Sequence, residues 1–116
     1  MNQLINYVRK ENNVPIAVFV AYQTEDRVRI GYATCHPNDT FDKKWGKIIA
    51  FGRADKFDQK KQINVPQRIA TEFFAFLQNC LDRQSFQGKY FPRWMNDPNN
   101  VSFPGVVVDI PKAMES

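Results

Sequence analysis

Hydrophobic and polar residues alternate along the first third of the chain in a way that predicts three β-strands. The run Pro15–Tyr22 is apolar on both sides, which is typical of a central strand. The flanking runs, residues 4–9 and Arg27–Cys35, alternate apolar with polar positions, and short polar turns separate the three runs. Residues 1–36 are therefore predicted to form an antiparallel β-meander.

The two faces of this meander differ in composition. The middle strand turns Phe19 and two alanines to one face and larger aliphatic residues to the other. If the larger set packs against helices, the outer face carries Phe19 together with Arg27 and Arg29 of the third strand. Such a cationic, aromatic sheet face can stack bases or contact a protein. In the alternative arrangement the C-terminal segment covers this face, and the pattern favours neither.

A basic helix is predicted over residues 39–60. Asp39 or Thr40 can act as its N-cap, and Asp42 follows Asp39 at the spacing of a capping box. At about 100° per residue the large apolar side chains fall in one arc, which we interpret as the core face: Phe41, Trp45, Ile48, Ile49 and Phe51. Small residues recur on the opposite side: Gly46, Ala50 and Ala54.

Three lysines open this helix at the positive end of its dipole. A cation there costs about a few tenths of a kcal/mol, so Lys43, Lys44 and Lys47 oppose helix formation. With Arg53 they belong to residues 38–62, which hold seven Lys and Arg against four Asp, a local charge of +3 out of a net +4. A solvated face explains this stretch. The sharper interpretation is a surface that meets phosphates or an acidic protein.

A second helix is predicted over residues 66–84, and its amphipathic pattern is the clearest in the chain. Its wide apolar arc is interpreted as core: Ile69, Ala70, Phe73, Phe74, Phe76, Leu77, Cys80 and Leu81. Prolines interrupt residues 88–116, while Tyr90, Phe91, Trp94 and Phe103 offer apolar anchors. Within that segment, Val106–Ile110 predicts a short strand that pairs with the sheet edge of its own domain or, alternatively, with a partner.

These elements predict one α+β domain over residues 1–116, with a three- or four-stranded antiparallel sheet and both helices packed on one face. A hydrophobic content of 43% with 14% aromatics excludes a disordered chain. No apolar run reaches 18 residues and no signal peptide is recognisable, so we expect no membrane association. Cys35 and Cys80 lie far apart in apolar patterns, which predicts buried, reduced thiols and a cytoplasmic protein.

Residues for catalysis or metal binding are scarce. The only histidine, His36, follows Cys35, and neighbouring side chains of a strand point to opposite faces, so the two do not form a nucleophilic pair. The spacing of a four-ligand zinc site and a glycine-rich phosphate loop are both absent. We therefore predict no enzyme activity, no metal and no cofactor.

Residues 31–54 resemble a motif of small bacteriophage-encoded proteins of unknown function. In those proteins a strand leads into a Cys-x-Pro-x-Asp-x-Phe-x-Lys-x-Gly-like run and then Ala-x-Gly-Arg-Ala. Here the corresponding positions run from Cys35 to Lys44 and Gly46, and then from Ala50 to Ala54. The resemblance implies expression in a bacterial cytoplasm and an accessory role, such as acting on a host factor.

The order of elements is also similar in form to the double-stranded RNA-binding domain, in which lysines at a helix N-terminus grip phosphates. The matching residues here would be Lys43, Lys44 and Lys47. That domain has a helix before its first strand, and this chain begins with a strand, so the likeness is an analogy.

The leading functional hypothesis is a non-enzymatic, phage-type accessory protein that contacts a host protein or a nucleic acid, with inhibition of a host factor as one outcome. Its predicted binding residues are those of the basic helix and the outer sheet face: Lys43, Lys44, Lys47, Arg53, Arg27, Arg29 and Phe19. A dedicated RNA- or DNA-binding module is the first alternative and a small enzyme the second. A homodimer through the sheet edge or its open face is also compatible with the pattern.

Overall fold

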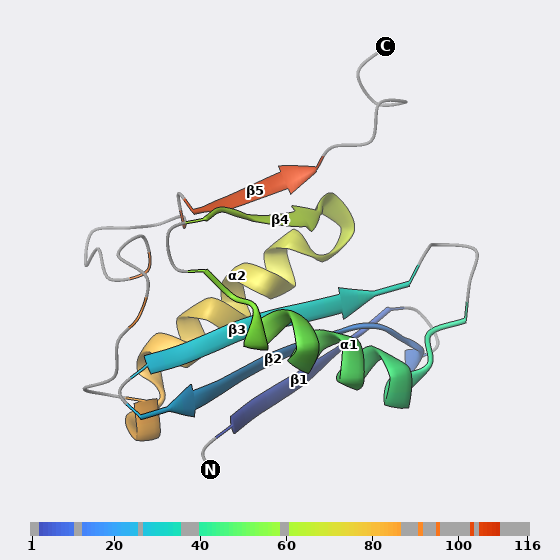
Figure 1. The fold of residues 1–116 in the computed structure, drawn as a ribbon. Helices are drawn as coiled ribbons and strands as arrows, with labels where there is room; N and C mark the ends of the chain where they lie inside the picture. The colour runs from blue at the N-terminus through green and yellow to red at the C-terminus, as the bar shows by residue number, and fades with distance from the viewer. Residues whose placement is uncertain are drawn as a thin grey trace.

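The computed structural model describes residues 3–10, 13–25, 27–35, 40–58, 61–86, 91, 95, 103 and 105–109. The chain begins with an antiparallel sheet in the order β1-β2-β3, which confirms the predicted meander (Figure 1). Its strands are β1 (Gln3–Arg9), β2 (Pro15–Thr24) and β3 (Arg27–Thr34). The later elements are α1 (Lys43–Asp55), β4 (Ile63–Pro66), α2 (Gln67–Asp82), the short 3₁₀ helix η2 (Gln84–Phe86) and β5 (Val106–Asp109).

The two helices cover opposite faces of this sheet. Val18 and Val20 of β2 share a buried cluster with Ala50 and Ala54 of α1, whereas Phe19 belongs to a second cluster with residues of α2. In Figure 1, α1 lies in front of the sheet and α2 behind it. The α+β class is confirmed, but the prediction that both helices pack on one face is wrong. Because β2 is apolar on both sides, each side needs its own cover.

Phe19 lies in the larger core, beneath α2. Its ring centroid is 5.1 Å from that of Phe73 in an edge-on arrangement and 5.4 Å from that of Phe76. The predicted core arc of α2 is confirmed, since its buried residues are Ile69, Ala70, Phe73, Phe76, Leu77 and Cys80. The prediction of an open sheet face carrying Phe19 is wrong, because the phenylalanines of α2 fill that face.

Strands β4 and β5 form a separate two-stranded sheet. They run parallel, with Ile63 opposite Val106 and Val65 opposite Val108. The predicted strand near residue 106 therefore exists and pairs within the chain, but its partner is β4 and not an edge of the meander. A parallel pair needs a long crossover, which α2 and the segment after it supply.

Aromatic residues anchor the C-terminal segment to the core. Phe103 is buried and stacks on Phe74 of α2 with ring centroids 5.9 Å apart, and Phe91 is also buried. The other two predicted anchors, Tyr90 and Trp94, lie outside the described residues.

The two cysteines are not joined by a disulfide and lie in different settings. Cys80 is buried, whereas Cys35 is half-buried, so the prediction of two buried thiols is correct for Cys80 alone. Burial raises the pKa of the Cys80 thiol to about 12, against a smaller lowering by the charge of Arg83. None of the described helices is long and apolar enough to cross a membrane.

Candidate functional site

Helix α1 begins at an aspartate cap. The Asp42 carboxylate accepts hydrogen bonds from the backbone N–H groups of Lys44 at 2.9 Å and Trp45 at 3.1 Å. The helix thus starts four residues later than predicted, and Thr40 is not its cap; Asp39 lies outside the described residues. These two bonds satisfy N–H groups that have no partner within the helix.

The side of α1 that faces the sheet consists of small residues. Its buried residues are Gly46, Ala50 and Ala54. Gly31 of β3 lies against Ala50 and Ala54: a Cβ at position 31 would overlap the carbonyl oxygen of Ala50 and come within 2.6 Å of the backbone nitrogen of Ala54. The two backbones therefore approach too closely for any larger side chain.

Three of the large apolar residues of α1 are exposed as a result. Trp45 is 62% exposed, Ile48 52% and Ile49 44%. The sequence correctly places them in one arc, but the prediction that this arc is the core face is wrong for these three residues. The other two members of the predicted arc, Phe41 and Phe51, are half-buried and pack against the cluster that contains Ala50 and Ala54. Exposed residues of that side make up what we call the α1 outer face: Lys44, Trp45, Ile48, Ile49 and Gly52.

A groove lies beside the α1 outer face. It has a volume of about 440 Å³, and its lining includes Ala33 and Cys35 from the end of β3, Phe41, and Trp45 and Ile49 from the helix. The groove extends the exposed apolar surface past the helix itself. A side chain projecting from a partner could enter it.

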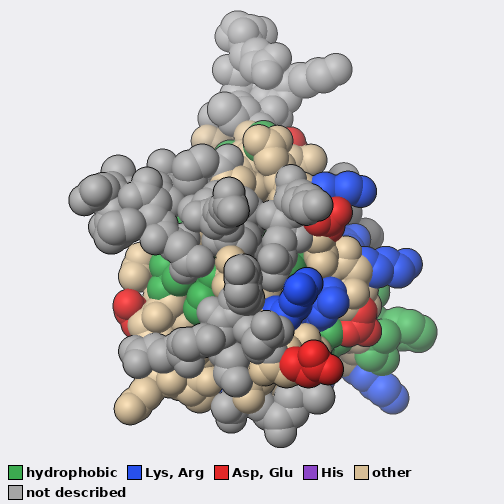
Figure 2. All heavy atoms as spheres, turned by 60° about the vertical axis from the view of Figure 1, so that its left-hand side comes forward, with side chains coloured by type: hydrophobic (Ala, Val, Ile, Leu, Met, Phe, Trp, Pro, Cys, Tyr) green, Lys and Arg blue, Asp and Glu red, His purple; other side chains and the backbone are tan. Residues whose placement is uncertain are grey.

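Cations flank the α1 outer face on both sides. Lys43 and Lys47 are one helical turn apart on one flank, and the Lys43 Nζ lies 5.1 Å from the centroid of the Tyr7 ring. On the other flank, Arg53 lies 5.7 Å over the Tyr32 ring and donates a hydrogen bond of 3.0 Å to the Tyr32 carbonyl oxygen. Figure 2 shows hydrophobic side chains projecting at the right-hand edge of the molecule among Lys and Arg side chains.

The chain matches no protein-family model, no curated protein and no solved structure.

The arginines of β3 are separate from the α1 outer face. Arg29 donates hydrogen bonds from Nη1 to the carbonyl oxygens of Asp55 at 3.1 Å and Phe57 at 3.4 Å, at the end of α1. A cation there complements the negative end of the helix dipole, which is a structural role. Arg27 is exposed and lines a different hollow with Thr24, Glu25 and Arg29.

Of the seven predicted binding residues, the four on α1 are therefore brought together, and Arg27, Arg29 and Phe19 are not. Prediction from the sequence missed Trp45, Ile48 and Ile49 as surface residues. The stripe of Gly46, Ala50 and Ala54, with Gly31 inside a strand, was the signal that could have revealed them, because small residues permit close packing. Among the described residues, no three His, Cys, Asp or Glu side chains gather as a metal site.

Proposed function

We propose that this protein is a non-enzymatic binding protein that docks a partner protein on the α1 outer face. The observation that carries the proposal is the exposure of Trp45, Ile48 and Ile49 on a helix that buries only small residues. Isolated exposed apolar residues are common on protein surfaces, but a contiguous cluster with a polar rim is typical of an interaction site. Tryptophan is also among the residues most enriched at the energetic centres of interfaces.

The charges around this face favour an acidic, amphipathic segment of another protein as the occupant. Lys43, Lys44, Lys47 and Arg53 surround the apolar centre, whereas Asp42 caps the helix and Asp55 accepts a hydrogen bond from the Tyr22 hydroxyl. Carboxylates flanking an apolar stripe would complement this arrangement. A second copy of the chain would instead bring like charges together across a symmetric interface.

Nucleic acid is the less favoured occupant. The lysines could meet phosphates, and Trp45 could stack on a base. However, Ile48 and Ile49 have no counterpart in a phosphate backbone and are more than two-fifths exposed. Together with the resemblance of residues 31–54 to phage-encoded proteins, this face supports contact with a protein of a bacterial host.

The test is capture of a partner from bacterial lysate, with and without nuclease treatment, by the full-length protein and by two variants. The first variant carries Trp45→Ser, Ile48→Ser and Ile49→Ser. The second carries Val14→Ser, which removes an equally exposed apolar side chain from the β1–β2 turn. We expect the triple variant to keep its fold and to lose at least tenfold in affinity for whatever wild type captures, since interface tryptophans often contribute about 2 kcal/mol or more. Val14→Ser should bind as wild type does.

Three outcomes would contradict the proposal. The triple variant could capture the same protein as well as wild type does. Nuclease treatment could abolish capture, which would identify a nucleic acid as the bound species. Light scattering could show a wild-type dimer that the triple variant loses, which would make a second copy the occupant.

A further inference from the structure

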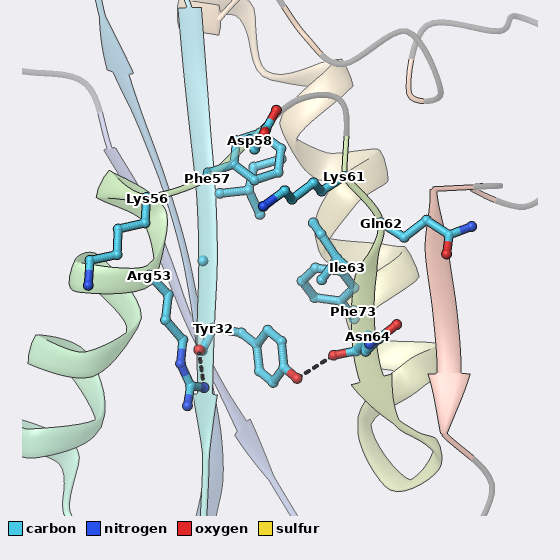
Figure 3. A pocket seen from close by; sticks show the side chains of 12 residues that line it. Tyr32, Arg53, Lys56, Phe57, Asp58, Lys61, Gln62, Ile63, Asn64 and Phe73 are labelled. Atoms are coloured by element: carbon cyan, nitrogen blue, oxygen red, sulfur yellow. Dashed lines mark hydrogen bonds between the residues drawn. The ribbon is translucent and has the colours of Figure 1, made fainter.

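A second site lies on the other side of α1 from Lys43 and Lys47. A pocket of about 240 Å³ separates β3 from β4, and the segment after α1 closes one end of it. In Figure 3 the two strands run side by side, and the Tyr32 side chain spans the gap between them. We call this the β3–β4 pocket. Of the α1 outer face and the cations that flank it, only Arg53 also lines this pocket.

Apolar side chains form a large part of the walls of the β3–β4 pocket, and three of them are aromatic. They include Ile30 and Tyr32 from β3, Phe57 from the segment after α1, Ile63 from β4 and Phe73 from α2. Apolar cavities of about 150 Å³ stay dry and take up benzene. A pocket of about 240 Å³ can therefore hold one aromatic ring together with a substituent or a second fused ring.

Tyr32 is held as a fixed wall of this pocket. Its hydroxyl donates a hydrogen bond to the Asn64 carbonyl oxygen, Arg53 lies over its ring, and the Phe73 ring centroid is 5.8 Å away. Burial raises the pKa of Tyr32, Arg53 lowers it and Asp109 raises it, with a net rise. The hydroxyl therefore stays protonated at neutral pH and can keep its hydrogen bond to the Asn64 carbonyl oxygen.

The pocket also carries a positive charge. Arg53, Lys56 and Lys61 contribute cations to its lining, against the carboxylate of Asp58. Figure 3 shows Lys61 reaching across toward Phe57 and Asp58, whereas Lys56 extends away on the far side of β3. Arg53 already donates a hydrogen bond to the Tyr32 carbonyl oxygen. Lys61 is therefore the cation best placed to contact a ligand in the pocket.

We infer that the β3–β4 pocket binds a small aromatic anion. Its ring lies among Tyr32, Phe57, Ile63 and Phe73, and its carboxylate or phosphate meets the Lys61 ammonium. This site is independent of the α1 outer face, and binding there requires no partner protein. Apolar walls with one placed charge are the usual design of small-molecule sites.

The test uses three probes of one shape and different charge: 2-naphthoate, 2-naphthylmethanol and 2-naphthylmethylamine. Each is titrated into the isotope-labelled, full-length protein, and amide shifts are followed by NMR. We expect 2-naphthoate to give saturable shifts that include Gly31 and Asn64, with an affinity at least fivefold above the neutral alcohol and further above the amine. No saturable shifts at these residues, or equal affinity for all three probes, would overturn the inference.

Two variants separate the charge from the cavity. Lys61→Gln should reduce the affinity for 2-naphthoate to that of the alcohol and leave the alcohol unchanged. Lys47→Gln, an exposed lysine outside the pocket, should alter neither affinity. If Lys47→Gln weakens naphthoate binding as much as Lys61→Gln does, the attraction is a general effect of net charge and the assignment of Lys61 is wrong.

Discussion

Gly31 and Gly52 have different roles, because Gly31 lies in the contact between α1 and the sheet and Gly52 lies outside it. Gly31 lies where β3 meets α1, and any side chain there would collide with the helix backbone. Gly52 lies on the α1 outer face, and a Cβ there would have no atom within 4 Å. The first glycine is required by packing, whereas the second only lowers the helix propensity of α1.

Gly31→Ala should therefore destabilise the protein by about 1–3 kcal/mol or more, because backbone atoms cannot yield as a flexible side chain would. Gly52→Ala should stabilise it by about 0.8–1 kcal/mol through helix propensity. Urea denaturation followed by circular dichroism measures both. Equal effects of the two substitutions would contradict the close approach of α1 and β3.

Single residues also show which part of the candidate site could not be predicted from the sequence. The periodicity of Trp45, Ile48 and Ile49 places them on one side of α1, but periodicity alone cannot say which side faces the sheet. Burial of large side chains is the usual outcome, and it was the expected one. Here the small residue at position 31 decides the orientation, and a contact between distant parts of the chain is needed to recognise that.

At the scale of the element, the start of α1 combines a favourable cap with unfavourable charge. Asp42 caps the first turn, yet Lys43, Lys44 and Lys47 lie in the first two turns, near the positive end of the dipole. Lys43 and Lys47 are also like charges one turn apart, which is destabilising by about 0.2–0.5 kcal/mol. A helix selected for stability alone would carry acidic residues there, which supports a role for these lysines in contact.

The double variant Lys44→Glu, Lys47→Glu tests this interpretation. It should raise the free energy of unfolding by about 0.3–1 kcal/mol, because glutamates suit the helix N-terminus and a carboxylate at position 47 would pair with Lys43. The same variant should weaken partner capture, so stability and binding change in opposite directions. Urea denaturation measures the first effect and capture from lysate the second.

The matched control is Lys56→Glu, at the C-cap of α1. There a negative charge meets the negative end of the dipole, so stability should fall by about 0.3–1 kcal/mol while capture is retained. If Lys44→Glu, Lys47→Glu retains full capture, these lysines do not belong to the binding surface.

Most of the elements were predictable because they have local signals, but strand β4 was not predicted. The three strands, both helices and the strand near residue 106 all follow from periodicity and turn residues. The start of α1 was placed too early because Asp39, Thr40 and Asp42 are all competent caps, and only the backbone geometry at Asp42 selects one.

At the scale of the whole molecule, the chain folds back on itself through β4 and β5. Ile63 pairs with Val106, which is 43 residues later in the sequence. The Tyr32 hydroxyl bonded to the Asn64 carbonyl oxygen links this small sheet to the meander. The segment before β5 packs on α2 through Phe103. The C-terminal segment is therefore part of the folded unit in its described residues.

Deletion of residues 100–116 should consequently destabilise the protein by about 3–6 kcal/mol, since Phe103 and Val106 each lose burial worth about 1.5–3 kcal/mol. Total stabilities of domains are about 5–15 kcal/mol, so the truncated chain should be marginal. Thermal melting with light scattering measures the loss and any association through the exposed edge of β4.

Val107→Thr provides the control, because Val107 is exposed on β5 and threonine keeps the β-branched shape. Its stability should remain within about 0.5 kcal/mol of wild type. A truncated protein that melts as the full chain does but captures no partner would instead identify β5 as a docking strand.

The topology was only partly predictable, because it depends on contacts between segments that are far apart in the sequence. Sequence patterns identify which residues are apolar on two sides, as in β2, but not which helix covers which side. The pairing of β5 with β4 depends on a crossover whose path has no local signature. Both errors, helices on one face and a fourth strand on the meander, arise from contacts between distant segments.

The small-residue packing of α1 on β3 has a consequence for how this protein can change over generations. Because Ala50, Ala54 and Gly31 hold the helix in place, substitutions at positions 45, 48 and 49 meet little resistance from the fold. Under the proposed function, these three positions can change the binding specificity without a comparable loss of folding stability. On the proposed function, related proteins with this fold can therefore adapt to changes in the partner's surface through a few substitutions while the fold stays the same.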